Sequence, residues 1–173
     1  MKSTYSLPTA KPYAFAFDPR RTALVIIDVQ KDFVDPLGFG SIQCGSSEIF
    51  AGVRAVVGKI KTALDASRAL GIHVVHTREG HRPDLSDLPA SKKHRQVNNP
   101  NGHHSLGIGE QGPMGRLLVR GEEGHDIVEE LAPLPSEIVI DKSGKGSFWA
   151  TDLHRKLMAR GITHLLFTGV TTE

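Results

Sequence analysis

The sequence contains a single cysteine and no long apolar run, and both shortages limit where the protein can work. Cys44 has no second cysteine to pair with, so an internal disulfide is excluded and a reducing compartment is expected. The longest apolar run covers residues 23–27, far less than a membrane-spanning helix needs, and the polar N-terminus lacks a signal-peptide core. We therefore expect a cytoplasmic protein with no membrane partner.

An excess of charge of one sign is also lacking. Lysine and arginine number 21 against 19 aspartates and glutamates, and the resulting net charge of +2 gives no reason to expect a nucleic-acid partner. The one dense basic run, at residues 92–95, is expected to be a solvated loop. With 173 residues, 39% of them hydrophobic, the chain has the size and composition of one globular domain.

Short apolar runs alternate with helical patterns along most of the chain. After an N-terminal arm over residues 1–20, we expect a single domain over residues 21–173. Strands are predicted at residues 23–27, 72–76, 137–140 and 164–168, and helices at residues 49–70, 126–131 and 150–160. This alternation predicts an α/β fold of three αβα layers, with a mostly parallel sheet covered by helices on both faces.

Two segments have no clear period. Residues 35–47 are rich in glycine and are interpreted as a loop. Residues 80–121 are rich in proline, glycine, asparagine and histidine, with a short helix expected at residues 114–119. Loops of this length inside a compact domain are usually functional, so we expect the longer segment to be a lid or binding loop.

Chemically active residues follow the predicted strands. In open α/β sheets, sites form beyond the carboxyl ends of the strands, which here places Asp28 and Lys142 at one edge. A partly desolvated aspartate can act as a general base, and a lysine beside it can stabilise a nucleophile or an oxyanion. Taken singly, each could equally be an ordinary surface charge or cap, so the hypothesis depends on the pair.

Three segments resemble the isochorismatase-like cysteine hydrolases in order and spacing: residues 25–33 (VIIDVQKDF), 140–153 (IDKSGKGSFWATDL) and 165–173 (LLFTGVTTE). The resemblance covers about residues 20–173 and implies a Rossmann-like topology. Residues 76–85, 107–116 and 141–148 are further similar to biuret hydrolase and triuret hydrolase. Residues 35–47 depart from that pattern, which leaves the substrate open.

The resemblance implies an acyl-transfer mechanism with no cofactor. Asp28 would move the proton and Lys142 would stabilise a cysteine thiolate two positions beyond Glu173, so we expect the domain to continue past that residue. Cys44 lies in a different loop and is no substitute. The backbone at Val170 and Thr171 would form a cis peptide bond and contribute to the oxyanion hole.

Around these groups, the resemblance implies a pocket for a small amide. We expect Phe33 and Phe148 to wall it, and Arg78, Glu79 and Lys145 to contact the substrate. No metal is expected, because the histidines that metal-binding nicotinamidase relatives place after the first aspartate are missing here.

The leading hypothesis is an amidohydrolase that cleaves biuret to allophanate and ammonia. Alternatives are a sibling hydrolase for triuret, ureidoacrylate, an N-carbamoyl compound or isochorismate, and a non-catalytic ligand-binding relative. A nucleotide-binding module is disfavoured, because the G-x-G-x-x-G pattern at residues 107–112 follows no predicted strand and precedes Pro113. Members of the resembled family are commonly dimers or tetramers, so a homo-oligomer is expected.

Overall fold

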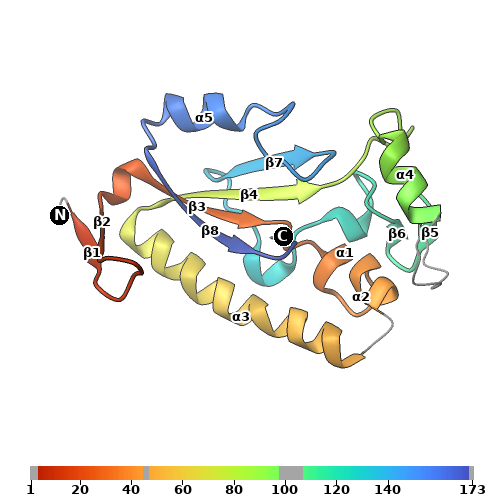
Figure 1. Cartoon of the computed structure of the whole chain (residues 1–173), viewed down its shortest axis with the longest axis horizontal. Helices are drawn as coiled ribbons and strands as arrows, with labels where there is room; N and C mark the ends of the chain where they lie inside the picture. The colour runs from red at the N-terminus through yellow and green to blue at the C-terminus, as the bar shows by residue number, and fades with distance from the viewer. Residues whose placement is uncertain (1–3, 45–46, 98–106, 172–173) are drawn as a thin grey trace.

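A four-stranded parallel sheet forms the centre of the protein in a computed structural model (Figure 1). The structure describes residues 4–44, 47–97 and 107–171. The strands are β3 (Thr22–Ile27), β4 (His73–Glu79), β7 (Ile138–Lys142) and β8 (His164–Gly169), in the order β7-β4-β3-β8. All four predicted strands are therefore confirmed.

The strand order creates a switch point beside β3. The chain runs outward from β3 to β4 and then β7, and it returns to pair β8 with the other side of β3. Val25 accordingly faces Val75 on one side and Phe167 on the other. Ligands of open α/β sheets bind at such a point, beyond the carboxyl ends of the strands.

Helices cover both faces of the sheet, which confirms the predicted three layers. On one face lies α3 (Ser47–Leu70), and on the other lies α5 (Leu153–Ala159) (Figure 1). Successive strand residues point to opposite faces, so Leu24 and Ile26 join the core under α3 while Ala23 and Val25 join the core under α5. Burial of each large aliphatic side chain contributes about 1.5–3 kcal/mol before the entropy of folding is counted.

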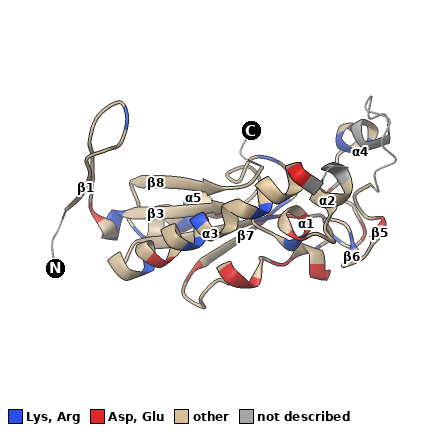
Figure 2. Cartoon of the chain, turned by 90° about the horizontal axis from the view of Figure 1, so that it is seen from below, with Lys and Arg blue, Asp and Glu red and all other residues tan. Residues whose placement is uncertain are grey.

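The N-terminal segment forms a hairpin of β1 (Tyr5–Leu7) and β2 (Phe15–Phe17), followed by a 3₁₀ turn at Pro19–Arg21. It stands at the end of the molecule away from α4 (Ala90–Val97), as Figures 1 and 2 show. Phe17 is buried in the core under α3 and anchors the hairpin there.

Three local predictions differ from the structure. Residues 35–47 include a helix, α2 (Phe39–Cys44), which follows the short α1 (Lys31–Val34). Instead of a helix at residues 114–119, β5 (Gln111–Gly112) and β6 (Gly115–Arg116) form a small hairpin, whose bend depends on the positive φ of 92° at Gly115. Where we predict a helix at residues 126–131, two 3₁₀ turns at Glu123–His125 and Glu129–Leu131 flank an extended link.

Within the described ranges, no helix combines the length and the apolar character that crossing a membrane would require.

Candidate active site

A buried carboxylate lies at the switch point between β3 and β8. Asp28 follows β3, is 1% exposed, and has a positive φ of 52°, an unfavourable backbone conformation that tends to mark functional positions. Its oxygens accept hydrogen bonds from the Thr77 hydroxyl at 2.6 Å, the Lys142 ammonium at 2.7 Å and the Thr171 hydroxyl at 3.0 Å. Three strand ends thus hold one carboxylate in a fixed orientation.

The ammonium of Lys142 is as buried as the carboxylate that it contacts. The side chain is 2% exposed, and its nitrogen lies 2.7 Å from Asp28 Oδ2, 3.3 Å from Glu79 Oε2 and 3.1 Å from the Gly144 carbonyl oxygen. These three contacts use all three N–H donors of the lysine. A buried ion pair with its hydrogen bonds satisfied is stable as a pair, whereas either partner alone would be a costly buried charge.

Glu79 is the second carboxylate of the site. Gln30 clamps its backbone, donating to the Glu79 carbonyl oxygen at 2.9 Å and accepting from the Glu79 N–H at 2.6 Å. Burial raises the pKa of Glu79, but the hydrogen bond and charge of Lys92 and the charge of Lys142 outweigh it, so the pKa lies below its usual range. Glu79 is therefore an anion between two ammonium groups.

The second ammonium comes from α4. Lys92 Nζ pairs with Glu79 Oε1 and also lies 3.1 Å from His81 Nε2 and 3.4 Å from the Ser143 carbonyl oxygen. The expectation that residues 92–95 form a solvated loop is therefore wrong for Lys92, which α4 turns inward. A neighbouring lysine of the same helix, Lys93, is exposed as expected.

A cavity of about 220 Å³ opens in front of these charges. One wall is apolar, with the rings of Phe33 and Phe39 edge to face at a centroid distance of 6.4 Å. The wall is completed by Glu79, Lys92, Ile108, Leu118, Lys142, Lys145 and Thr171. Asp28 lies behind Lys142 and Thr171 rather than in the wall. The arrangement can orient a small polar molecule against aromatic edges while a buried acid accepts or returns a proton.

Most of the predicted site residues lie at the switch point or in the cavity wall. Asp28, Lys142 and Thr171 converge at the switch point, and Phe33, Glu79 and Lys145 line the cavity. Arg78 and Phe148 lie elsewhere.

Arg78, which we predict to contact the substrate, does not line this cavity, because neighbouring residues of a strand point to opposite faces. Arg78 Nε donates to Asp141 Oδ1 at 2.7 Å, and its side chain lines a different surface hollow. Phe148 is 48% exposed and does not contribute to the cavity wall.

The backbone at the end of β8 also differs from expectation. Within the described ranges, the cis peptide bond is Lys11–Pro12, so the bond predicted between Val170 and Thr171 is not cis in this structure. The chain instead turns through a positive φ of 57° at Thr171, which brings the threonine hydroxyl onto Asp28. Val170 is buried in the core under α3.

Sequence reasoning missed two polar groups of the site, Thr77 and Lys92. A signal for Thr77 existed, since it directly follows the strand predicted at residues 72–76 and so falls at its carboxyl end. No local pattern indicates the inward turn of Lys92. Among the residues that the structure describes, no group of three or more histidine, cysteine or acidic side chains is placed to hold a metal ion.

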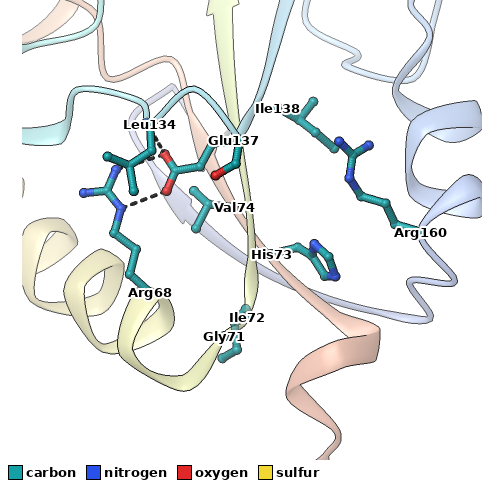
Figure 3. A pocket seen from close by; sticks show the side chains of 10 residues that line it. Arg68, Gly71, Ile72, His73, Val74, Leu134, Glu137, Ile138 and Arg160 are labelled. Atoms are coloured by element: carbon teal, nitrogen blue, oxygen red, sulfur yellow. Dashed lines mark hydrogen bonds and ion pairs between the residues drawn. The ribbon is translucent and has the colours of Figure 1, made fainter.

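A second cavity, of about 350 Å³, lies at the amino end of β4 (Figure 3). Arg68 and Glu137 form a two-point ion pair in its wall, at 2.8 and 2.9 Å, while His73 and Arg160 lie on the other side. Glu137, which directly precedes β7, also lies 3.1 Å from His76 of β4 and accepts from the Leu134 N–H at 2.9 Å, so it joins α3, β4 and β7. We assign this cavity no chemistry.

Comparison with known proteins identifies relatives of this architecture. The isochorismatase domain family matches residues 22–173. A cysteine hydrolase from Pseudomonas syringae pv. phaseolicola 1448A superposes with a TM-score of 0.66 at 26% identity, covering 90% of this chain and 62% of that one. An isochorismatase family protein from Desulfovibrio vulgaris subsp. vulgaris str. Hildenborough gives 0.64 at 32% identity, covering 87% of this chain and 67% of that one.

An N-carbamoylsarcosine amidase from Thermoplasma acidophilum shares the fold at lower identity. Its TM-score is 0.56 at 22% identity, and the match covers 86% of this chain and 67% of the amidase. This chain therefore spans about two thirds of the length of the solved structures that it resembles.

Proposed function

The chain belongs to the isochorismatase family, and we propose that the protein is a cysteine-dependent amidohydrolase in which Asp28 transfers protons beside Lys142. The reaction is hydrolysis of a C–N bond in a small, linear, urea-like amide, with biuret as the first candidate and allophanate and ammonia as its products. The observation that carries the proposal is the buried Asp28–Lys142 ion pair, 2.7 Å long, at the switch point of the sheet.

In the proposed mechanism, the nucleophile is the cysteine that the family resemblance implies two positions beyond Glu173. Asp28 accepts the thiol proton, and Lys142 stabilises the thiolate that forms. The sulfur attacks the carbonyl carbon, and the C–N bond breaks as Asp28 returns the proton to the leaving nitrogen. A water molecule then loses a proton to Asp28 and attacks the thioester, which releases the acid product and regenerates the thiol.

The site supports this chemistry in two ways. Asp28 is held in one orientation by Thr77, Lys142 and Thr171, so little reorganisation accompanies proton transfer. Lys142 is held 2.7 Å from Asp28, so a positive charge lies beside the proposed base and can stabilise an anionic nucleophile.

The cavity supports a small substrate. About 220 Å³ leaves room for a molecule of few heavy atoms, and the wall offers both aromatic surface and charged groups, which suits a flat, polar amide. The similarity of residues 76–85 to biuret hydrolases makes biuret the first substrate to test, ahead of triuret, ureidoacrylate, N-carbamoyl amino acids and isochorismate.

The test is a substrate panel with the full-length polypeptide, including whatever follows Glu173 in its reading frame. We expect ammonia release from biuret to exceed that from N-carbamoyl amino acids, and intact-mass spectra to show one thiol that alkylates rapidly and is protected by substrate. If isochorismate were turned over and the other panel members were not, the proposed substrate class would be wrong. An alkylation pattern limited to Cys44, with no turnover of any panel member, would overturn the hydrolase proposal.

A further inference from the structure

Lys92 connects the α4 helix to the buried charges of the site. Its side chain is 19% exposed although the helix lies on the surface, and its nitrogen contacts Glu79, which in turn contacts Lys142. The contacts form an unbroken row of alternating charge: Asp28, Lys142, Glu79 and Lys92. The segment that carries α4 therefore contributes a charged group to the row.

The row is electrically balanced only with Lys92 in place. Two carboxylates, Asp28 and Glu79, face two ammonium groups, Lys142 and Lys92. Without Lys92, the two carboxylates would share the single charge of Lys142 in a site where both are at most 11% exposed. Two buried anions that share one cation bind a proton more readily than either does in a balanced pair.

We propose that Lys92 is a positioning residue that occupies one oxygen of Glu79 and thereby leaves Lys142 to Asp28. The inference depends on the proposed function, because it assigns Asp28 the role of base. Lys142 lies 2.7 Å from Asp28 and 3.3 Å from Glu79, so its shorter contact is already with Asp28. The Lys92 ammonium competes with Lys142 for Glu79, so Lys142 keeps its shorter contact with Asp28.

The groups behind Lys92 fix its direction. A lysine has donors only, so the His81 Nε2 atom 3.1 Å away accepts, and the ring proton resides on Nδ1, 3.2 Å from Asp87 Oδ1. Arg120 lies 3.5 Å from the other oxygen of Asp87. Burial and the neighbouring Lys92 charge lower the pKa of His81, which keeps this ring in its neutral, accepting form. Lys145 is a further cation of the cavity wall and is not one of the four groups of the row.

The first experiment measures the protonation of the carboxyl groups directly and does not depend on turnover. In the full-length polypeptide with ¹³C-labelled aspartate and glutamate carboxyls, NMR titration follows Asp28 and Glu79. Because Lys142 would then be drawn toward Glu79, we expect Lys92→Met to raise the midpoint of Asp28 by about 1–3 pH units, the usual effect of losing a nearby opposite charge. Lys92→Arg should restore the original midpoint, and Lys93→Met, one residue along the same helix, should leave it unchanged.

A shift of the same size in Lys93→Met, or unchanged midpoints in Lys92→Met, would overturn the inference. The double variant Lys92→Met with Glu79→Gln removes one charge of each sign, and we expect the midpoint of Asp28 to return to its original value. This variant also provides a balanced background should Lys92→Met fold poorly. A shifted Asp28 midpoint in the double variant would contradict the proposed balance.

The second experiment separates this inference from the proposed function. On the substrate that the panel selects, Lys92→Met should move the acidic limb of the kcat/KM profile upward by the same interval as the NMR midpoint and lower kcat more than it raises KM. If no substrate is turned over but the NMR shift appears, the hydrolase proposal fails and the balanced row stands. If turnover is normal and neither the limb nor the midpoint moves, Lys92 has no positioning role.

Discussion

The two ends of the central sheet both bury a carboxylate among positive charges, but with different outcomes. At the amino end, Glu137 accepts from Arg68, His76 and the Leu134 N–H, and the Arg68–Glu137 pair lies in the wall of the cavity there. At the carboxyl end, Asp28 and Glu79 share two lysines in front of a cavity that reaches Lys142. One arrangement joins elements of the fold, whereas the other places charged groups in front of a cavity.

The difference lies in how many carboxylates share each cation. Arg68 provides a two-point contact to Glu137 alone, and that interaction, together with His76, outweighs burial and lowers the pKa of Glu137. Lys142 instead bridges Asp28 and Glu79, so neither carboxylate has this ammonium to itself. We therefore expect substitutions at the carboxyl end to affect activity and those at the amino end to affect structure alone.

The largest expected effect is a loss of activity, and it distinguishes the carboxyl end of the sheet from the amino end. Asp28→Asn keeps the shape of the carboxyl-end network but removes the base, and we expect kcat/KM of the full-length enzyme to fall by about 10³–10⁴-fold, near the upper range for general acid–base catalysis. Glu137→Gln, the matched change at the amino end, should leave kcat/KM within about twofold after correction for folded protein. Equal losses in both variants would remove the functional distinction between the ends.

The next effect concerns the free energy of unfolding. Lys142→Met leaves Asp28 as a buried charge without its partner, and we expect a loss of about 3–5 kcal/mol in denaturant titrations at pH 7. Adding Asp28→Asn removes the orphaned charge and should recover much of that loss. A loss of less than 1 kcal/mol for the single variant would contradict a dry, tightly paired site.

A smaller effect depends on pH and on His125, which lies against Gly80 near the carboxyl end. Burial, aided by the charge of Arg78, lowers its pKa to about 4, and its buried Nε2 atom has no hydrogen-bond partner among the described residues. Because the unfolded chain binds the proton more readily, the neutral ring contributes stability that is present above pH 6.5 and is lost as the pH falls toward 4.

Between pH 6.5 and pH 5, this linkage amounts to about 2 kcal/mol of unfolding free energy at about 1.4 kcal/mol per pH unit. The measurement compares wild type with His125→Gln over that interval, and the variant should lose correspondingly less stability. Parallel curves for the two proteins would show that His125 does not titrate as its burial implies.

The smallest effect tests the amino-end network as structure. Glu137→Gln retains a polar group but weakens the pair with Arg68, which is itself 24% exposed, so we expect a loss of about 1–2 kcal/mol. Thermal unfolding at pH 7 measures it, with Glu130→Gln on the more exposed pair with Arg54 as a control of near-zero effect. A larger loss than for Lys142→Met would reverse the ranking of the two ends.

The same contrast explains what the sequence could reveal. Continuous apolar runs such as residues 23–27 predicted the strands, because a strand buried on both faces is apolar at nearly every position rather than at alternate ones. Asp28, Lys142 and Glu79 were predictable because parallel strands bring their carboxyl ends to one edge. Prediction from sequence reached its limit at the end of β4. Arg78 and Glu79 are adjacent in sequence, and only the register of the strand decides which one faces the cavity.

Lys92 shows what requires the folded chain. Its direction depends on how α4 packs over Glu79 and His81, and the basic run in which it occurs is typical of exposed helices. The prediction for residues 114–119 failed for a similar reason, since the β5–β6 hairpin is set by backbone geometry at Gly115 rather than by a periodic apolar pattern. Long irregular segments are positioned by tertiary contacts that no local pattern records.

The pairing of β3 with β8 also has a kinetic consequence. The hydrogen bond from Thr171 to Asp28 joins residues 143 positions apart, so the site closes only after one of the most distant contacts in the fold has formed. Contacts of such separation form slowly, because the entropy of closing the intervening loop is lost before they stabilise the chain. During synthesis, Asp28 leaves the ribosome well before β8 does, so a nascent chain carries this carboxylate before the strand that leads to its Thr171 contact has formed.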